Sequence, residues 1–390
     1  MMSVSYDAAG GEATLRCSRA SRIGAFMDVA PYEAAGLYDP KAANASERQE
    51  LLEWLAARGI TIEQMVHAQR ETSLTGLAAD LALRPGRRFT ADEVAARAGV
   101  PVEQVLGLSL AAGLNVARDE AVYSEGDVQM FAGFAVGRTL FGETATRRFT
   151  HTIGSALGRV AEAAVTLYQV NVEGPIRAAG GTELEFAQQN LRAIEALQVV
   201  ERIIHVLFRA HVESAIRRLR LARPRKSADT ALLAVGFVDM VGFTTLSHRI
   251  STQELGEVVE RFEETAHDVV TALDGRLVKV IGDEVMFVVR DPAAACDIAL
   301  TLVERFKGDP AVTPRGGVAV GELLVRSGDY YGPIVNLASR VAQLAVPNEM
   351  LVTAEVAAAA SGSRLRFEPA GKRMLKGLDE PVTLLAVERA

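Results

Sequence analysis

Two aspartates stand where oxygen ligands for a hard cation are expected. Asp239 follows the apolar run 232–238. Asp283 lies between the apolar runs 277–281 and 285–289, a pattern that predicts a β-hairpin with a Gly-Asp tip. Mg²⁺ binds carboxylates and keeps positions for phosphates and water. We therefore expect Asp239 and Asp283 to form a two-metal site, with two ordinary surface aspartates as the alternative.

The residues that follow Asp239 fit a phosphate group. Gly242 lets backbone N–H groups approach a phosphate, and Phe243 and Thr244 open a helix whose N-terminus attracts anions. Alone, this segment is a weak signal. Together with Asp239 and Asp283 it predicts a metal–triphosphate site.

Four more polar residues are suited to a nucleotide. Asn336 and Arg340 are four residues apart in a helical pattern and share one helix face. Arginine stabilises charge on phosphorus and asparagine can orient a sugar, although an ordinary surface pair has the same spacing. Lys279 as a donor and Asp329 as an acceptor match the N1 and N6 edge of adenine.

Strands and helices alternate in the part of the chain that carries these residues. The order is a strand, a helix, the hairpin, a second helix and another strand, followed by further elements. The expected ranges are 232–238, 251–273, 277–289, 292–306, 316–320, 336–344, 351–353 and 382–387, with a late strand at Phe367. A β-α-β-β-α-β core of this kind predicts a ferredoxin-like α/β sandwich over 226–390.

The first part of the chain, 1–225, has helical patterns throughout and predicts an all-α domain. Its last helix is the longest: Thr182 and Glu185 form a capping box, and the pattern continues over 182–222. His205 and His211 lie on this helix on different faces, which makes them a poor metal pair. We expect either ordinary packed or solvated histidines or a response to pH near neutrality.

Two other features of this part leave alternatives open. Segment 89–114 resembles a helix-turn-helix, but its second helix, 102–110, has no lysine or arginine to bind DNA phosphates. We therefore favour a packed helical hairpin. Gly154 and Gly158 permit close helix packing, or alternatively leave a slot for an apolar ligand.

Composition indicates a soluble two-domain protein. The 390 residues are 49% hydrophobic and carry a net charge of −7, which argues against a broad nucleic-acid or anionic membrane surface. Cys17 and Cys296 give neither a zinc spacing nor a disulfide framework, so we expect a cytoplasmic protein. The first eleven residues lack the pattern of a secretory leader, and no apolar run approaches the roughly 18 residues of a membrane span.

The second part resembles the catalytic domain of class III nucleotidyl cyclases. Segments 237–244, 279–283 and 329–340 carry the resemblance, in that order along the chain. It implies a head-to-tail homodimer with active sites at the interface. It also implies two Mg²⁺ or Mn²⁺ ions per site, held by Asp239, Asp283 and the carbonyl of Met240.

The resemblance also implies roles for the remaining residues. Lys279 and Asp329 from the other copy would select adenine, Asn336 would orient the ribose, and Arg340 would stabilise the transition state. Lys376 would hold the outer phosphates, although Lys372 and Arg373 lie close by in the sequence.

The first part resembles the helical regulatory domain of certain actinobacterial cyclases, in which pH or fatty acids modulate an autoinhibited enzyme. The whole chain therefore predicts an adenylate cyclase that converts ATP into 3′,5′-cyclic AMP and pyrophosphate in signal transduction. One alternative is a guanylate cyclase. Another is a non-catalytic helix-turn-helix regulator or sensor that uses the cyclase fold to dimerise.

Overall fold

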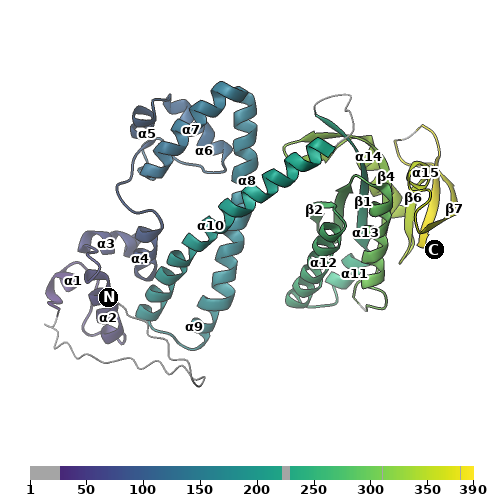
Figure 1. The fold of residues 1–390 in the computed structure, drawn as a ribbon. Helices are drawn as coiled ribbons and strands as arrows, with labels where there is room; N and C mark the ends of the chain where they lie inside the picture. The colour runs from purple at the N-terminus through teal and green to yellow at the C-terminus, as the bar shows by residue number, and fades with distance from the viewer. Residues whose placement is uncertain (1–26, 222–228, 310, 378) are drawn as a thin grey trace, which may run out of the picture. The chain divides into compact units, whose positions relative to one another are not determined.

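A computed structural model describes residues 27–221, 229–309, 311–377 and 379–390 (Figure 1). Cys17 and the expected boundary at 225/226 lie outside these residues. The chain divides into two compact units, which we describe separately. One comprises Met1–Val102, Ala117–Phe131 and Gly158–Arg202, and the other comprises Glu103–Val116, Ala132–Leu157 and Ile203–Ala390.

The helices begin in the first unit, and several of them cross the division. They are α1 (Ala30–Ala34), α2 (Ala45–Ala56), α3 (Ile62–Glu71), α4 (Leu74–Leu83), α5 (Ala91–Ala98), α6 (Val102–Ala111), α7 (Glu125–Phe141), α8 (Glu143–Tyr168), a π-helical turn (Gln169–Glu173), α9 (Gly174–Ala178) and α10 (Glu183–Leu221). No helix among the described residues is both long enough and apolar enough to cross a membrane. The expected all-α architecture of this part is confirmed.

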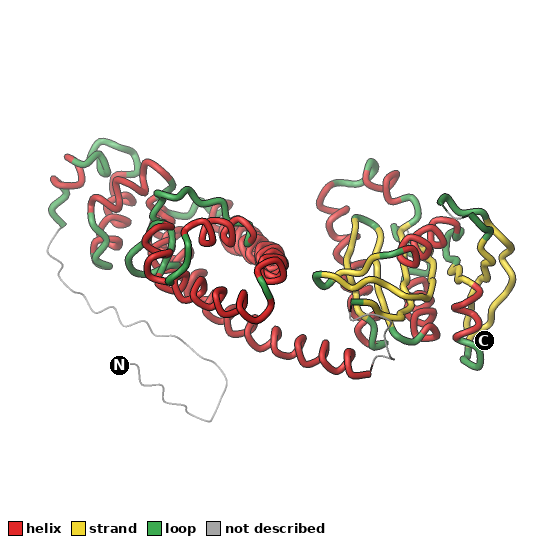
Figure 2. Tube along the Cα trace, turned by 90° about the horizontal axis from the view of Figure 1, so that it is seen from above, coloured by secondary structure: helices red, strands yellow, loops and turns green. Residues whose placement is uncertain are grey.

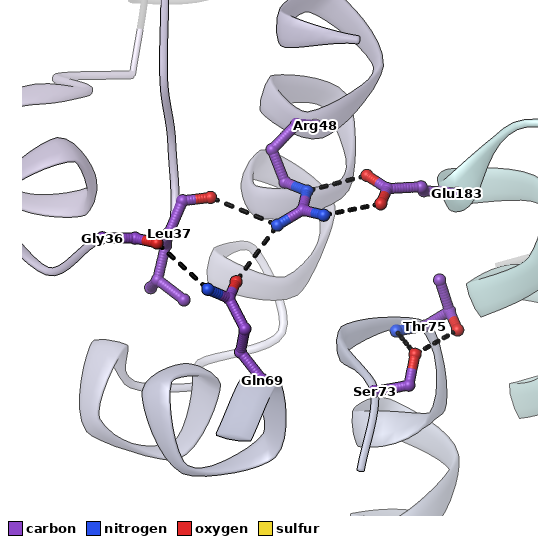
Figure 3. Close-up of polar contacts among 7 residues, drawn as sticks. All are labelled: Gly36, Leu37, Arg48, Gln69, Ser73, Thr75 and Glu183. Atoms are coloured by element: carbon purple, nitrogen blue, oxygen red, sulfur yellow. Dashed lines mark hydrogen bonds and ion pairs between the residues drawn. The ribbon is translucent and has the colours of Figure 1, made fainter. Parts of the chain in front are cut away.

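An ion pair joins the first turn of α10 to α2 in the first unit. Arg48 on α2 donates from Nε to Glu183 Oε2 at 2.8 Å and from Nη2 to Oε1 at 2.6 Å (Figure 3). Its third nitrogen donates to the carbonyl of Leu37 and to Gln69. Both partners are about three-quarters buried, and a carboxylate at a helix N-terminus also interacts favourably with the helix dipole.

The long helix is 39 residues, as its sequence pattern predicts. The Thr182 hydroxyl accepts the amide of Glu185 at 3.2 Å, which caps its start. Farther along, the Asn190 side chain donates to the carbonyl of Thr75 at 3.0 Å. His205 and His211 are both exposed on α10, so neither is a packed core histidine.

Among the residues that the structure describes, the sheet of the second unit has eight strands. They are β1 (Thr230–Met240), β2 (Arg276–Ile281), β3 (Glu284–Val289), β4 (Pro314–Arg326), β5 (Asp329–Tyr331), β6 (Met350–Thr353), β7 (Leu365–Arg373) and β8 (Val382–Arg389). Their order is β2-β3-β1-β4-β6-β8-β7, with β5 paired to β4. The first four lie antiparallel in the order β2-β3-β1-β4, which confirms the expected ferredoxin-like core.

Helices cover the two faces of this sheet unequally. The helices are α11 (Phe243–Ser247), α12 (Thr252–Ala272), α13 (Pro292–Arg305), α14 (Pro333–Leu344) and α15 (Ala354–Ala359) (Figures 1 and 2). Phe262 of α12 and Ile298 of α13 are buried with Val238 and Phe287 on one face. On the other face Ala338 of α14 is buried with residues such as Val235, Phe237 and Met286. Alternate residues of β1 therefore point to different helix layers.

The second unit also holds a close helix contact. A Cβ built at Gly154 of α8 would lie 2.3 Å from the carbonyl oxygen of Ala112, just after α6. Real side chains do not approach that closely, so only glycine fits there. This contact supports the helix-packing interpretation of Gly154.

We predict that Gly154→Ala lowers the free energy of unfolding by roughly 1–3 kcal/mol, because the new methyl group forces backbone apart. Gly158→Ala is the matched control, since nothing lies within 4 Å of its Cβ position. That control gains up to about 1 kcal/mol of helix propensity. Urea unfolding of both variants gives their free energies of unfolding. Equal values for the two variants would contradict the close contact between Gly154 and Ala112.

Candidate active site

The two aspartates of the expected metal site lie beside each other, one near the end of a strand and the other in a hairpin turn. Asp239 is next to last in β1, and Asp283 lies in the turn between β2 and β3. The Met240 amide donates to the carbonyl of Asp283 at 3.0 Å, which fixes the hairpin tip beside the end of β1. Gly282 has φ +64°, a conformation that favours glycine in a tight turn.

The site concentrates negative charge. Burial raises the pKa of Asp283, and the carboxylate of Asp239 raises it further. Burial, together with the charges of Asp239 and Asp283, raises the pKa of Glu284 to about 7. Glu284 is the direct register partner of Asp239 on the neighbouring strand. No pattern in the sequence indicates this third carboxylate, because only the pairing of β1 with β3 places it opposite Asp239.

Arg315 on β4 contributes a cation to this cluster, and its place beside Asp239 is likewise not indicated by the sequence. Its Nη2 and Nε donate to Asp239 Oδ2 at 3.0 and 3.2 Å, and both side chains are largely buried. Its Nη1 donates to the carbonyls of Gln343 and Ala345 at the end of α14. Arg315 therefore joins the end of β1 to the end of a helix while it offsets the charge of Asp239.

These residues fit a divalent cation. Asp239 and Asp283 supply carboxylate oxygens, which are the donors that Mg²⁺ and Mn²⁺ prefer, and Asp239 already binds a cationic group. Among the described residues, no group of three or more His, Cys, Asp or Glu side chains is arranged as a metal cage. Any bound metal would thus need ligands from the backbone, water or a nucleotide phosphate.

Lys279 and Asp329 form a direct ion pair. Lys279 Nζ on β2 lies 2.7 Å from Asp329 Oδ2 on β5. The Tyr330 amide donates to Asp329 Oδ1 at 2.7 Å. Burial opposes the ionisation of Asp329, but the hydrogen bonds from Lys279 and the Tyr330 amide outweigh it and lower the pKa of Asp329. The donor and acceptor expected from the sequence are brought together within one chain.

The remaining expected residues gather at α14 and near β1. Asn336 is exposed one turn before Arg340 on α14. A Cβ at Gly377 would lie 3.6 Å from the Arg340 guanidinium, so Arg340 lies beside the turn that carries the exposed Lys376.

The segment expected to bind phosphate follows β1. Gly242 has φ +79° and precedes the short helix α11. Phe243 packs against the core of the sheet, and Thr244 is exposed. Phe243 therefore has a packing role, while the glycine turn leaves Thr244 at the surface.

The acidic cluster and Asp329 lie at different ends of β4. Asp239 is the register partner of Arg315, and Asp329 is the register partner of Arg326, eleven residues farther along the strand. The structure thus assembles the expected residues into groups: Asp239 with Asp283, Lys279 with Asp329, and Arg340 beside the Lys376 turn.

Known proteins match both parts of the chain. Residues 226–387 match the adenylate and guanylate cyclase catalytic domain, and residues 31–212 match the adenylate cyclase regulatory domain. A protein of Mycobacterium tuberculosis is 33% identical over 362 residues, which are 91% of this chain and 93% of that protein. An adenylate cyclase of Streptomyces coelicolor is 34% identical over 296 residues, 75% of this chain and 76% of its own. A pH-sensitive adenylate cyclase of M. tuberculosis is 32% identical over 378 residues, 88% of each chain.

We predict that Arg315→Met lowers the free energy of unfolding of the metal-free protein by roughly 1–3 kcal/mol, because Asp239 loses a charged hydrogen-bond partner. Asp239→Asn should remove most of this penalty. Urea unfolding in EDTA of both single variants and the double variant gives the coupling between them. Strictly additive effects would show that the two side chains do not stabilise each other.

Proposed function

The chain belongs to the class III adenylate cyclases, and we propose that it converts ATP into 3′,5′-cyclic AMP and pyrophosphate in a homodimer with two active sites. The observation that carries the proposal is the preformed Lys279–Asp329 pair, in the same domain as the adjacent Asp239 and Asp283. One pair suits a purine edge, and the other suits metal-bound phosphates.

In this proposal Asp239, Asp283 and the carbonyl of Met240 hold two Mg²⁺ or Mn²⁺ ions. When bound, the metals would supply Lewis-acid activation of the ribose 3′-hydroxyl and neutralise the triphosphate charge. The backbone around Gly242 and Thr244 contacts the phosphates, and Lys376 holds the outer ones.

At phosphorus the reaction forms one bond and breaks one, and the ribose hydroxyl also loses its proton. The ribose 3′ oxygen attacks the α-phosphorus, and the bond from that phosphorus to the oxygen bridging to the β-phosphate breaks. Pyrophosphate leaves with the electron pair, and the 3′-hydroxyl proton passes to water. Asn336 orients the ribose, and the Arg340 guanidinium stabilises the charge that develops on the α-phosphoryl oxygens.

Base selection follows from hydrogen-bond direction. Lys279 donates to N1 of adenine, and Asp329 accepts from its N6 amino group. Guanine presents the opposite order at these positions, with an N1 donor and an O6 acceptor. The ion pair between Lys279 Nζ and Asp329 Oδ2 holds the donor and the acceptor side by side before the base arrives, and their hydrogen-bond types match the order on adenine.

Assembly as a homodimer is part of the same proposal. The positions of Asp239 and Asp329 near different ends of β4 favour a site completed by a second copy. Exposed apolar side chains offer a surface for that copy. On the sheet unit they include Leu232, Tyr331, Val346 and Met374, and on α10 they include Val199, Ile203, Val206 and Val212.

A complementation experiment tests the metal site and the shared interface together. Asp239→Ala and Arg340→Ala should each lower the rate of cyclic AMP formation by roughly 10²–10³-fold as homodimers. In the proposed dimer each site takes Asp239 from one copy and Arg340 from the other. A heterodimer of the two variants, purified through two different tags, therefore has one complete site and should recover about half of the wild-type rate.

The control is Asp268→Ala on α12, whose side chain is 88% exposed and should leave the rate unchanged. A heterodimer as inactive as its parents would contradict the shared site. An active Asp239→Ala homodimer would contradict the metal role.

We further propose that residues 1–225 regulate a catalytic domain at 226–390 in a cytoplasmic enzyme. The family matches at 31–212 and 226–387 support this division. The pH-sensitive relative supports pH as a signal, and the exposed His205 and His211 on α10 are the candidate sensors. A fatty-acid ligand stays a prediction from the sequence, because the comparisons add no support for it.

The pH proposal predicts a flatter profile in histidine variants. Replacing His205 and His211 with asparagine should reduce the change in cyclase rate between about pH 5.5 and 7.5, because imidazole charge changes in this range. His267→Asn on α12, also exposed, is the matched control. Rates of purified full-length proteins at constant ionic strength give the result, and an unchanged profile would exclude these histidines as the sensors.

A further inference from the structure

Arg276 connects the strand that carries Lys279 with the turn that carries Asp329. Its Nη2 donates to the carbonyl of Gly328 at 2.7 Å. Its guanidinium carbon lies 5.6 Å from the ring centroid of Tyr330, within the range of a cation–π contact. Arg276 thus contacts the residues on both sides of Asp329 in the chain.

A bulge in β2 makes this arrangement possible. Residues three apart in a regular strand point to opposite faces. In β2, however, Leu277 pairs with Phe287 and Lys279 pairs with Met286, so one extra residue lies between them. The shift gives Arg276 and Lys279 register partners, Val288 and Met286, that belong to the same buried cluster under α14. Both long cationic side chains therefore leave β2 on one face, toward the β4–β5 turn.

The turn itself requires support. Ser327 and Gly328 both have positive φ, +53° and +78°, the conformation of a tight two-residue hairpin turn. Serine has a Cβ and is less suited than glycine or asparagine to the left-handed region. A hydrogen bond to the Gly328 carbonyl from outside the turn stabilises this conformation and fixes the position of the next residue, Asp329.

We propose that Arg276 is a positioning residue for base recognition. It fixes the β4–β5 turn against β2, so that the amine of Lys279 and the carboxylate of Asp329 face the purine at a constant separation. The planar guanidinium serves this purpose because it donates to a carbonyl and stacks near a ring at once, which a lysine cannot do. The inference rests on the proposed role of Lys279 and Asp329 in reading adenine.

The test compares ATP with GTP as substrates of the full-length enzyme. We expect Arg276→Met to lower the ratio of kcat/KM for ATP to kcat/KM for GTP by about tenfold, the loss typical of one charged hydrogen bond. The change should appear mainly in KM for ATP, since Arg276 touches no reacting group. Arg276→Lys keeps the positive charge but lacks the planar guanidinium. Its ratio of kcat/KM for ATP to kcat/KM for GTP should therefore lie between the ratios of the wild-type protein and Arg276→Met.

The control is Arg366→Met, which removes a comparable strand arginine that pairs with Glu388 on the β7–β8 side of the sheet. It should leave the substrate ratio unchanged whatever its effect on the melting temperature. A lowered ratio in Arg276→Met at a melting temperature matched by Arg366→Met supports positioning over general stability. If Arg276→Met fails to fold, the ratio measured for Arg276→Lys decides.

Lys279→Met separates failure of the inference from failure of the function. A lowered ratio for Lys279→Met, with no change for Arg276→Met or Arg276→Lys, would overturn the positioning role and keep the base-reading role. An unchanged ratio for all three variants would overturn both.

Discussion

The balance of charge around Arg315 is the interaction on which the acidic site depends. A metal site needs carboxylates close together, and a folded chain without metal resists that arrangement. Burial and mutual repulsion raise the pKa of both Asp283 and Glu284. Arg315 offsets this by donating twice to one oxygen of Asp239. The same guanidinium donates to carbonyls at the end of α14, the helix that carries Asn336 and Arg340.

Strand register also positions the residues proposed to bind the base. An extra residue in β2 places Arg276 and Lys279 on one face, and β5 returns along the last residues of β4 to present Asp329. Small backbone irregularities thus decide which side chains meet. Such irregularities are frequent next to active sites because they re-aim a side chain without disturbing the sheet around it.

The long helix α10 has residues in both units, as α7 and α8 also do. Its first turn is held by the ion pair between Arg48 and Glu183, and Asn190 farther along donates to the carbonyl of Thr75. Residues 203–221 of α10 belong to the unit that contains the sheet. Several apolar residues of α10 are exposed, and they belong to the surface that the proposed homodimer would use.

The sequence by itself determined the order of the main elements, the ferredoxin-like core, the long capped helix and the residues suited to a nucleotide, but not the short elements β5 and α15. It did so because hydrophobic period, capping residues and turn glycines are local signals. Only the tertiary structure placed Glu284 opposite Asp239, Arg315 against the same carboxylate, and Arg276 across from Gly328. These contacts join residues 45, 76 and 52 positions apart, and they depend on strand pairing and a bulge, which no local pattern encodes.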